Sequence, residues 1–315
     1  MIKVQNLEKS YEGKPALRGL SFTVQKGEIV ALTGLEGAGK TTALDVIAGV
    51  CEPDRGAVEI SVVALDGETS RARQLVGYVP AEPAEPRDMS PRAYLKFLAD
   101  ARGLSSREAS EKIDAAFKLL GIQEVADKSM RRLSPGALRL AAVAQAVFFE
   151  PDALVIDEPT QNLDPKEIMA LRAAIRETAK DRAVLLASRN LTEMCALCDR
   201  VLVLSEGRLV SEGTPGELHT MTRLSDTVRL VAKTGEAAAR AAFAGMKDVT
   251  VKSAKETADG VELTIDMAGD QREALFRAAM KANLPLVELA AARKPLDKLL
   301  EALASERVEG GSEEA

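Results

Sequence analysis

The stretch Gly34-Leu35-Glu36-Gly37-Ala38-Gly39-Lys40-Thr41 decides the fold class of this chain. It fits the pattern G-x-x-x-x-G-K-[ST], in which glycines let the backbone curl so that several N–H groups face one phosphate chain. The apolar run of residues 27–33 comes before it and predicts a buried strand, and a helix is expected after it. Lys40 would carry a charge to the β and γ phosphates, and Thr41 would offer its hydroxyl to Mg²⁺. The sequence therefore predicts a phosphate-binding loop.

A second apolar run, residues 154–156, ends in the two acids Asp157 and Glu158. At the end of a buried strand, Asp157 would hold the Mg²⁺ shell and Glu158 would polarise an attacking water as a general base. An apolar run that ends in Asp-Glu is common, but downstream of a phosphate-binding loop it becomes a strong signal. The two motifs together predict chemistry on a nucleoside triphosphate.

Size and composition argue against several other classes of protein. The chain has 315 residues, of which 46% are hydrophobic and 29% charged, so a globular protein of two domains is expected. The formal net charge of −6 disfavours a nucleic-acid partner, because phosphate backbones need a basic face. Three cysteines argue against a disulfide scaffold. No apolar window approaches the ~18–20 residues that a membrane crossing needs, so membrane association is expected only through a partner.

Strand-like and helical runs alternate in the first part of the chain, which predicts an α/β fold with a largely parallel sheet covered on its faces. The expected strands are residues 1–8, 18–24, 27–33, 153–156, 183–187 and 200–204, and the expected helices are 94–120 (broken at Gly103), 138–149 and 168–180.

The composition changes near residues 219–225, and shorter elements follow in the order βαββαβα. This order suits a small α+β domain of the ferredoxin-like kind. The boundaries expected from these changes are 1–218 for the first domain, 219–226 for a linker, 227–304 for the second domain and 305–315 for a disordered acidic tail. The second domain shows no obvious chemistry, so a structural or dimer-regulating role is the default expectation.

At this point the chain resembles the nucleotide-binding subunits of ABC transporters, over about residues 1–218. Besides the two motifs above, the resemblance rests on Tyr11, which matches an aromatic residue that stacks on adenine, and on three ordered segments. These segments are Gly77-Tyr78-Val79-Pro80 at the start of the Q-loop, Leu133-Ser134-Pro135-Gly136-Ala137 at the signature, and Asn162-Leu163-Asp164 at the D-loop. The resemblance implies a P-loop NTPase cassette with a RecA-like core and a helical subdomain over about 88–150. The second domain looks like those of exporter-type and gliding-motility-type members.

The resemblance also implies a set of site residues. The nucleotide-binding residues would be Tyr11, Gly34, Leu35, Glu36, Gly37, Ala38, Gly39, Lys40, Thr41 and Thr42. The metal ligands would be Thr41 and Asp157, the catalytic base Glu158, the signature residues acting on a second subunit Ser134 and Gly136, and the D-loop residue Asp164. ATP and Mg²⁺ are the implied cofactors. The implied partners are a membrane permease and a second ABC subunit, identical or different, and the implied location is the cytoplasmic face of the cell membrane.

Three positions depart from the family pattern. The Q-loop glutamine is Ala81, the first signature glycine is Pro135, and the H-loop histidine is Arg189. Glu82 or Glu85 could replace the missing glutamine only if the loop shifted. Arg189 could donate to a γ-phosphate, or it could be a tolerated surface charge. Glu36 is an unusual acid within a phosphate loop, and its side chain is expected to point outward.

These departures leave two functions open. The chain could be an ATPase that energises a membrane exporter, because Lys40, Asp157 and Glu158 are retained. It could instead be a degenerate ATP-binding subunit that regulates a more complete partner, because three sensing positions are replaced. A non-transport ABC protein acting on nucleic acid is disfavoured by the acidic balance and the single cassette.

Overall fold

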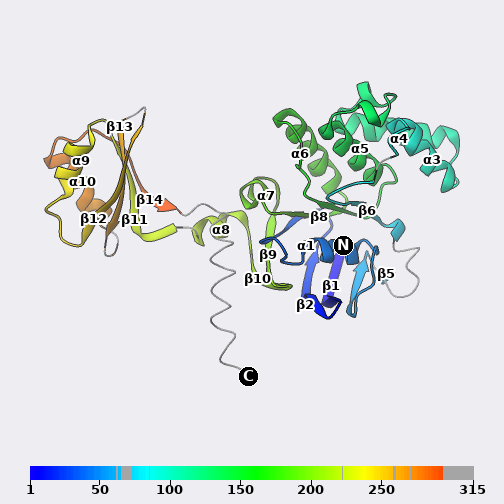
Figure 1. Ribbon diagram of the computed structural model, residues 1–315, viewed down its shortest axis with the longest axis horizontal. Coiled ribbons are helices and arrows are strands. Elements are labelled where there is room, and N and C mark those ends of the chain that lie inside the picture. Colours follow the sequence, from blue (N-terminus) through cyan, green and yellow to red (C-terminus); the bar gives the residue numbers. More distant parts are fainter. Residues whose placement is uncertain are drawn as a thin grey trace. The chain divides into compact units, whose positions relative to one another are not determined.

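The computed structural model describes residues 1–61, 63–64, 73–84, 86–221, 223–257, 260–267, 269 and 271–293. Contacts divide the chain into two units, Met1–Pro215 and Gly216–Leu299 (Figure 1). Each unit has its own buried apolar core. None of the helices in these described ranges is long and apolar enough to cross a membrane.

A six-stranded sheet forms the centre of the first unit, in the order β10-β9-β3-β8-β7-β6. Four of its neighbouring pairs are parallel, and only β10 runs antiparallel to its neighbour. The strands are β3 (Ile29–Thr33), β6 (Val76–Val79), β7 (Ala153–Asp157), β8 (Ala183–Ser188), β9 (Arg200–Ser205) and β10 (Arg208–Gly213). Every residue of β3, β7 and β8 is buried, as expected for parallel strands covered on both faces. The predicted α/β class and largely parallel sheet are confirmed.

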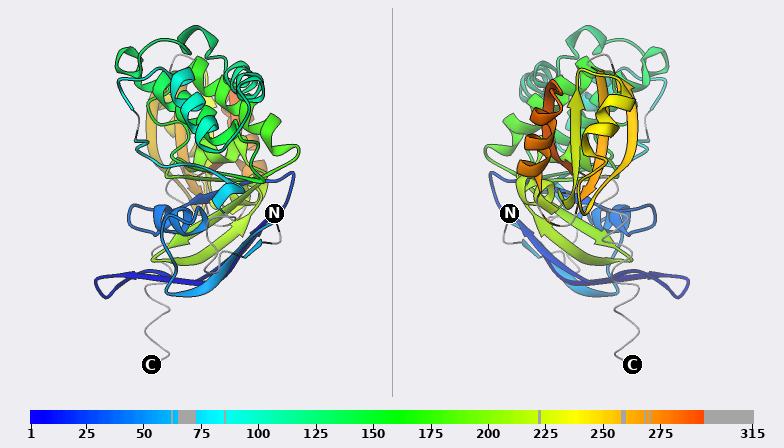
Figure 2. Two further views of the ribbon diagram at one scale, coloured as in Figure 1. Left: turned by 90° about the vertical axis from the view of Figure 1, so that its right-hand side faces the viewer. Right: turned by 90° about the vertical axis from the view of Figure 1, so that its left-hand side faces the viewer.

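A second, antiparallel sheet in the order β2-β1-β4-β5 lies in the same unit, and the sequence did not predict it as a separate sheet. Its strands are β1 (Ile2–Tyr11), β2 (Lys14–Val24), β4 (Arg55–Ile60) and β5 (Val63–Ala64). Figure 2 shows this sheet (blue) on one side of the unit and the helices of residues 91–147 (cyan to green) on the other. One core cluster contains residues of β1, β2, β3, β7 and β8 together with the inner face of α1 (Lys40–Ile47). This packing fixes the helix that begins at Lys40 between the two sheets.

Three capped helices make up the helical region between β6 and β7: α3 (Pro91–Ala101), α4 (Ser106–Leu120) and α5 (Pro135–Val147). The break expected at Gly103 lies between α3 and α4, where this glycine has φ 76°. The hydroxyl of Ser134 accepts from the N–H of Ala137 at 3.1 Å, and Pro135 is the first helical residue. Serine as cap and proline at the first position are both favourable, so the altered signature still starts a helix. That start lies earlier than residue 138, where the periodicity placed it, because capping and not the apolar pattern sets the boundary.

The remaining helices of this part of the chain are α6 (Pro165–Ala179), α7 (Leu191–Leu197) and α8 (Pro215–Met221), and two short 3₁₀ turns lie at η1 (Gln123–Val125) and η2 (Met130–Arg132). Helix α6 begins at Pro165, three residues ahead of the predicted start at 168, because Asp164 caps it in a capping box with Glu167.

Gly77 allows α5 to pack closely on β6. A Cβ at this position would lie 2.2 Å from the carbonyl oxygen of Ala146 and 2.9 Å from Pro151. We expect Gly77→Ala to lower the free energy of unfolding by about 1–3 kcal/mol, the usual cost of overpacking, in urea denaturation. Gly245→Ala is the control, because a Cβ at Gly245 meets no atom within 4 Å. Equal stability of the two variants would contradict the packing argument.

The second unit contains a four-stranded antiparallel sheet in the order β12-β13-β11-β14. Its elements are β11 (Arg223–Ala232), α9 (Glu236–Phe243), β12 (Val249–Thr257), β13 (Gly260–Met267), α10 (Arg272–Lys281) and β14 (Leu286–Arg293), which gives the order βαββαβ. Alternate residues of β13 face a core that also holds Phe243 and Leu275. The expected linker 219–226 contains the end of α8 and the start of β11. The helix expected at 296–304 and the tail 305–315 lie outside the described residues.

Candidate functional site

The predicted phosphate-binding loop joins β3 to α1, and two of its glycines, Gly34 and Gly39, are required by close backbone approaches. A Cβ at Gly34 would lie 2.2 Å from the carbonyl oxygen of Leu204, and one at Gly39 would lie 2.5 Å from that of Ala16. Gly39 has φ 101° and occupies the N-cap position of α1. The loop therefore runs close to strands of both sheets of this unit, at Leu204 and Ala16, and leads into the N-terminus of α1, where backbone N–H groups and the helix dipole attract anions.

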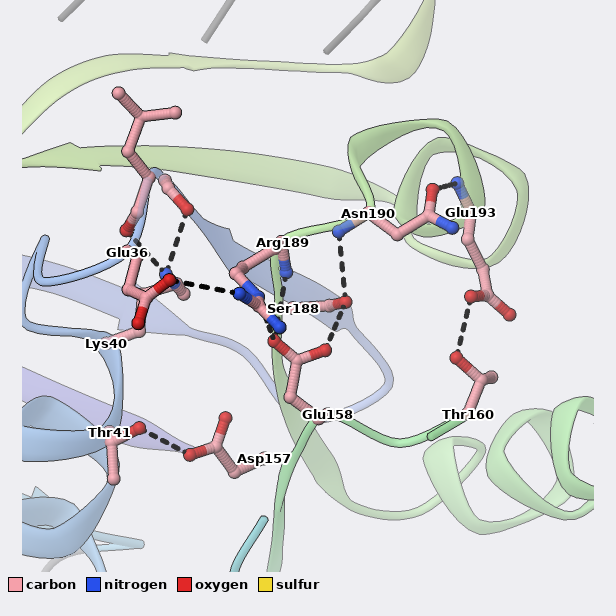
Figure 3. A network of polar contacts seen from close by, with 12 residues as sticks. Glu36, Lys40, Thr41, Asp157, Glu158, Thr160, Ser188, Arg189, Asn190 and Glu193 are labelled. Carbon is pink, nitrogen blue, oxygen red and sulfur yellow. Dashed lines mark hydrogen bonds and ion pairs between the residues drawn. The ribbon is translucent and has the colours of Figure 1, made fainter. Parts of the chain in front are cut away.

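Lys40 is almost buried, at 7% exposure, and its ammonium group lies within the loop. Its Nζ donates to the carbonyl oxygens of Gly34 at 2.8 Å and Leu35 at 2.9 Å (Figure 3). Burial lowers the pKa of Lys40, and the nearby carboxylates of Glu158 and Asp157 oppose that shift. The loop thus holds a desolvated positive charge at the place where phosphate oxygens are expected to bind.

The two predicted metal ligands lie together although 116 positions separate them in the chain. Thr41 Oγ1, in the first turn of α1, donates to Asp157 Oδ2 at 2.6 Å, at the end of β7 (Figure 3). Asp157 is buried, and burial raises the pKa of its carboxyl group, against the opposing hydrogen bond from Thr41. A carboxylate and a hydroxyl are the hard oxygen ligands that Mg²⁺ prefers, so the pair suits that ion.

The raised pKa of Asp157 predicts a stability effect. A carboxyl group whose folded-state pKa lies above its unfolded value stabilises the fold only at low pH, and this contribution is lost as pH rises through the folded pKa. We therefore expect Asp157→Asn to raise the Tm of the nucleotide-free protein at pH 7, and to raise it less at pH 4. Thermal unfolding at both values checks this, with the exposed Asp181→Asn as control. A lower Tm at pH 7 would show that the carboxylate stabilises the fold.

Glu158, the predicted base, is oriented by the end of the neighbouring strand β8. Its Oε2 accepts from Ser188 Oγ at 2.9 Å, and its Oε1 accepts from the backbone N–H of Arg189 at 3.2 Å (Figure 3). Its backbone has φ 45°, the left-handed region that non-glycine residues rarely occupy. Such strain persists where the surrounding structure fixes it, and it is frequent at functional sites. The arrangement directs the carboxylate toward the phosphate loop.

Arg189 stands at the position where the resemblance expects a histidine, and it bridges two carboxylates. Its guanidinium lies 3.6 Å from Glu158 Oε1 and 3.3 Å from Glu36 Oε2 (Figure 3). The Glu36 side chain is 89% exposed, which agrees with the expectation that it points away from the loop. Arg189 is thus more than an isolated surface charge, because it pairs the acid of the phosphate loop with the predicted base.

A further polar cluster, which the sequence did not predict, joins the segment after Glu158 to α7. Thr160 Oγ1 donates to Glu193 Oε2 at 2.6 Å, and Asn190 caps α7 by accepting from the N–H of Glu193 at 3.0 Å. The N–H of Asn190 donates to Ser188 Oγ at 3.1 Å (Figure 3). These bonds link the segment that follows Glu158 to the start of α7. Only the Ser-Arg-Asn run after a buried strand hints at them in the sequence.

The other predicted residues lie outside this cluster. Tyr11 ends β1 with its hydroxyl 3.8 Å from Cys51 Sγ. A Cβ at Gly136 would lie 2.0 Å from the Glu167 carboxylate, so the signature packs against the start of α6, which Asp164 caps. Among the described residues, no hydrogen bond joins Ser134 or Gly136 to the phosphate loop of the same chain. Ala81 presents no polar side chain, and Glu85 lies outside the described residues.

The sequence analysis also missed Arg139 of α5. Arg139 is 4% exposed, and its guanidinium donates to the carbonyl oxygens of Asp157 and Glu158. Arginine on an alanine-rich helix gives no sign of burial, so no signal in the sequence identifies it.

Comparisons with known proteins agree on one family. A family model described as ABC transporter matches residues 17–161. The chain is 34% identical over 218 residues to the uncharacterized ABC transporter ATP-binding protein YxlF of Bacillus subtilis, covering 69% of this chain and 72% of that protein. It is 29% identical over 313 residues to the linearmycin resistance ATP-binding protein LnrL of the same species, covering 95% and 96%. Among solved structures, CbiO1 of Clostridium perfringens, part of the ABC transporter complex CbiONQ, matches with a TM-score of 0.63 at 29% identity, covering 70% of this chain and 90% of CbiO1.

Proposed function

The chain belongs to the family of ABC transporter ATP-binding subunits, and from that premise we propose that it hydrolyses Mg-ATP to drive transport through a separate membrane permease. The main observation in support of the proposal is that Lys40, Thr41, Asp157 and Glu158 lie close together in space. These residues come from two distant segments, which the parallel strands β3 and β7 bring to the same edge of one sheet.

The geometry supports a role for each group in phosphoryl transfer. The phosphate chain would lie on the loop N–H groups and the N-terminus of α1. Lys40 would exchange carbonyl contacts within the loop for contacts with phosphate oxygens. Thr41 and Asp157 would hold Mg²⁺, which when bound supplies charge neutralisation at the phosphate oxygens. Glu158 would take the proton of the attacking water. The ring of Tyr11, which is 47% exposed, would be available to stack on adenine.

Arg189 would act beside the base in place of a histidine. Its guanidinium already contacts Glu158, and its side chain is 63% exposed, so a γ-phosphate can reach it. A phosphate would compete with Glu36 for the same N–H groups, because charge-assisted bonds to phosphate are strong and often bidentate. The Glu36–Arg189 pair would therefore open when ATP binds.

A second subunit would complete the site. Ser134 and Gly136 lie at the N-terminus of α5, away from the phosphate loop of their own chain, and would act on the nucleotide of a partner. Pro135 has no N–H to donate, which removes one possible contact with the γ-phosphate. Whether the partner is a second copy or another ABC subunit follows from the chains that co-purify.

The membrane permease would dock in a groove of about 430 Å³ between the C-terminal end of α1 and the helical region. Val50, Tyr78, Pro80 and Tyr94 are among the residues that line it. Val50 is 63% exposed, so its apolar side chain is accessible to a partner that enters the groove. The subunit would then lie on the cytoplasmic face of the cell membrane, held there by the permease.

Val50→Glu tests this docking. We expect the variant to lose most of the membrane proteins that co-purify with the wild-type chain from solubilised membranes, while its affinity for Mg-ATP is unchanged. The control is Met169→Glu, at a methionine that is 73% exposed on α6 and outside the groove. Equal recovery of membrane proteins with Val50→Glu and wild type would place the permease elsewhere.

One observation favours a second candidate function, a subunit that binds ATP and regulates a paired ATPase without hydrolysing ATP itself. The Arg189 guanidinium is already paired with both Glu36 and Glu158, and Ala81 offers no polar side chain to the γ-phosphate. Phosphate release from the purified complex, compared between wild type and a base variant, decides between the two functions.

A further inference from the structure

Arg139 is a buried arginine that none of the predicted roles uses. The buried polar side chains of the described residues are Thr33, Lys40, Arg139, Asp157, Thr178 and Ser188. Two of them carry a positive charge, and the charge of Lys40 belongs to the phosphate loop. Arg139 is only 4% exposed, and a buried charge is costly unless hydrogen bonds compensate it, so its partners indicate what it does.

Four hydrogen bonds of Arg139 go to backbone carbonyl groups at the ends of two neighbouring strands. Its Nη1 donates to Pro80 O at 2.6 Å and to Ala81 O at 3.1 Å, just after β6. Its Nη2 donates to Glu158 O at 2.9 Å and to Asp157 O, at the end of β7. Strands β6 and β7 are parallel neighbours, with Val79 opposite Ile156. One side chain of α5 therefore fastens both strand ends.

Each of these carbonyl groups belongs to a segment with a proposed task. Pro80 lines the groove proposed for the permease, as do Ala142 and Gln145 of the same helix as Arg139. Asp157 and Glu158 are the proposed metal ligand and base, and Glu158 has a left-handed backbone that the surroundings must fix. The planar guanidinium fork holds several acceptors in a fixed geometry, which a lysine ammonium cannot do. A displacement of α5 would therefore move the backbone at both places.

We propose that Arg139 is a positioning residue that couples the groove and the helical region to the nucleotide site, through its bonds to Pro80, Ala81, Asp157 and Glu158. The inference rests on the proposed function, because the groove and the base receive their roles there. The side chain of Ala81 cannot carry such a link, so the connection at this loop runs through backbone carbonyl groups and the guanidinium. Arg139 contacts neither nucleotide nor water in this role, and it acts through the position of Glu158.

Hydrogen exchange of the full chain tests the coupling without requiring hydrolysis. The probe is a non-hydrolysable Mg-ATP analogue, and the variants are Arg139→Met and Arg139→Lys. The control is Arg132→Met, at an exposed arginine of the 3₁₀ turn η2. In wild type and in the control, the analogue should slow exchange both in residues 34–42 and in residues 76–84 and 135–147. In Arg139→Met the analogue should still slow exchange in residues 34–42, with its Kd within about threefold of wild type. It should no longer slow exchange in residues 76–84 and 135–147. Arg139→Lys should retain only part of this slowing.

The results separate this inference from the proposed function. Full analogue-induced protection of residues 76–84 and 135–147 in Arg139→Met would overturn the coupling role. Equally, loss of protection in α5 before any nucleotide is added, in both variants, would mean that Arg139 only stabilises the fold. A wild-type chain that shows the coupled protection but releases no phosphate would contradict hydrolysis and leave the coupling supported. A chain that binds no analogue would overturn both proposals.

Discussion

Glu158→Gln is expected to lower phosphate release by about 10²–10⁴-fold, the usual contribution of a positioned general base, while Mg-ATP still binds with nearly the wild-type Kd. The amide retains an oxygen that can accept from Ser188 Oγ and the N–H of Arg189, so the local structure should survive. The amide cannot take a proton from water. The measurement is phosphate release by the complex purified from membranes through this chain, after every co-purified chain has been identified.

Glu177→Gln is the matched control, because Glu177 lies exposed on α6 and pairs only with Lys180 among the described residues. It should leave phosphate release unchanged. If Glu158→Gln also left it unchanged, hydrolysis would belong to a partner, and the regulatory function would be favoured. If turnover disappeared, Arg189 would become the next residue to replace, because its guanidinium lies 3.6 Å from the same carboxylate.

Lys40→Met should weaken nucleotide binding by about 10–100-fold, because hydrogen bonds to charged groups contribute about 1.5–3 kcal/mol. Methionine has a similar length and no charge, so the loop would lose its donor to the phosphates. The change also leaves the carbonyl oxygens of Gly34 and Leu35 without the Lys40 donor. Calorimetric titration with Mg-ATP gives the Kd directly.

Lys26→Met serves as the control for Lys40→Met, because Lys26 is exposed and pairs at 3.8 Å with Asp181 on the surface. Its Kd for Mg-ATP should equal that of the wild type. A Kd for Lys40→Met within about threefold of wild type would mean that the ammonium group serves only to hold the loop. The phosphate contacts would then come from backbone N–H groups alone.

The residues of the phosphate loop could be read from the sequence because their constraints are local. At positions 34 and 39 only glycine fits, because a Cβ would clash with nearby backbone and because Gly39 adopts a left-handed conformation at the start of α1. The strand before the loop appears in the sequence as an apolar run. The cap at Ser134 is equally local, since hydroxyl and N–H are three residues apart. Such features leave a fixed spacing in the chain, and spacing is what a sequence displays.

Other elements left no such mark. The strands β4 and β6 were not predicted, because they are short and show neither strict alternation nor a long apolar run. In the antiparallel sheet, β1 and β2 pair as a local hairpin, but β1 also pairs with the distant strand β4, as between Ile2 and Ile60. Hydropathy shows that a strand is half buried, but it does not show which strand lies beside it.

By itself the sequence determined the α/β class, the phosphate loop, the acidic pair Asp157-Glu158 and the three departures from the family pattern. Only the tertiary structure decided that Arg189 bridges Glu36 and Glu158, that Ser188 orients the base, and that Arg139 is buried against four carbonyl groups. The physical reason is that each of these contacts joins groups far apart in the chain, and that a buried charge such as that of Arg139 is tolerated only when hydrogen-bond partners surround it. Folding brings these groups together from separate strand ends. The residues adjacent in the sequence therefore give no sign of which groups will be partners.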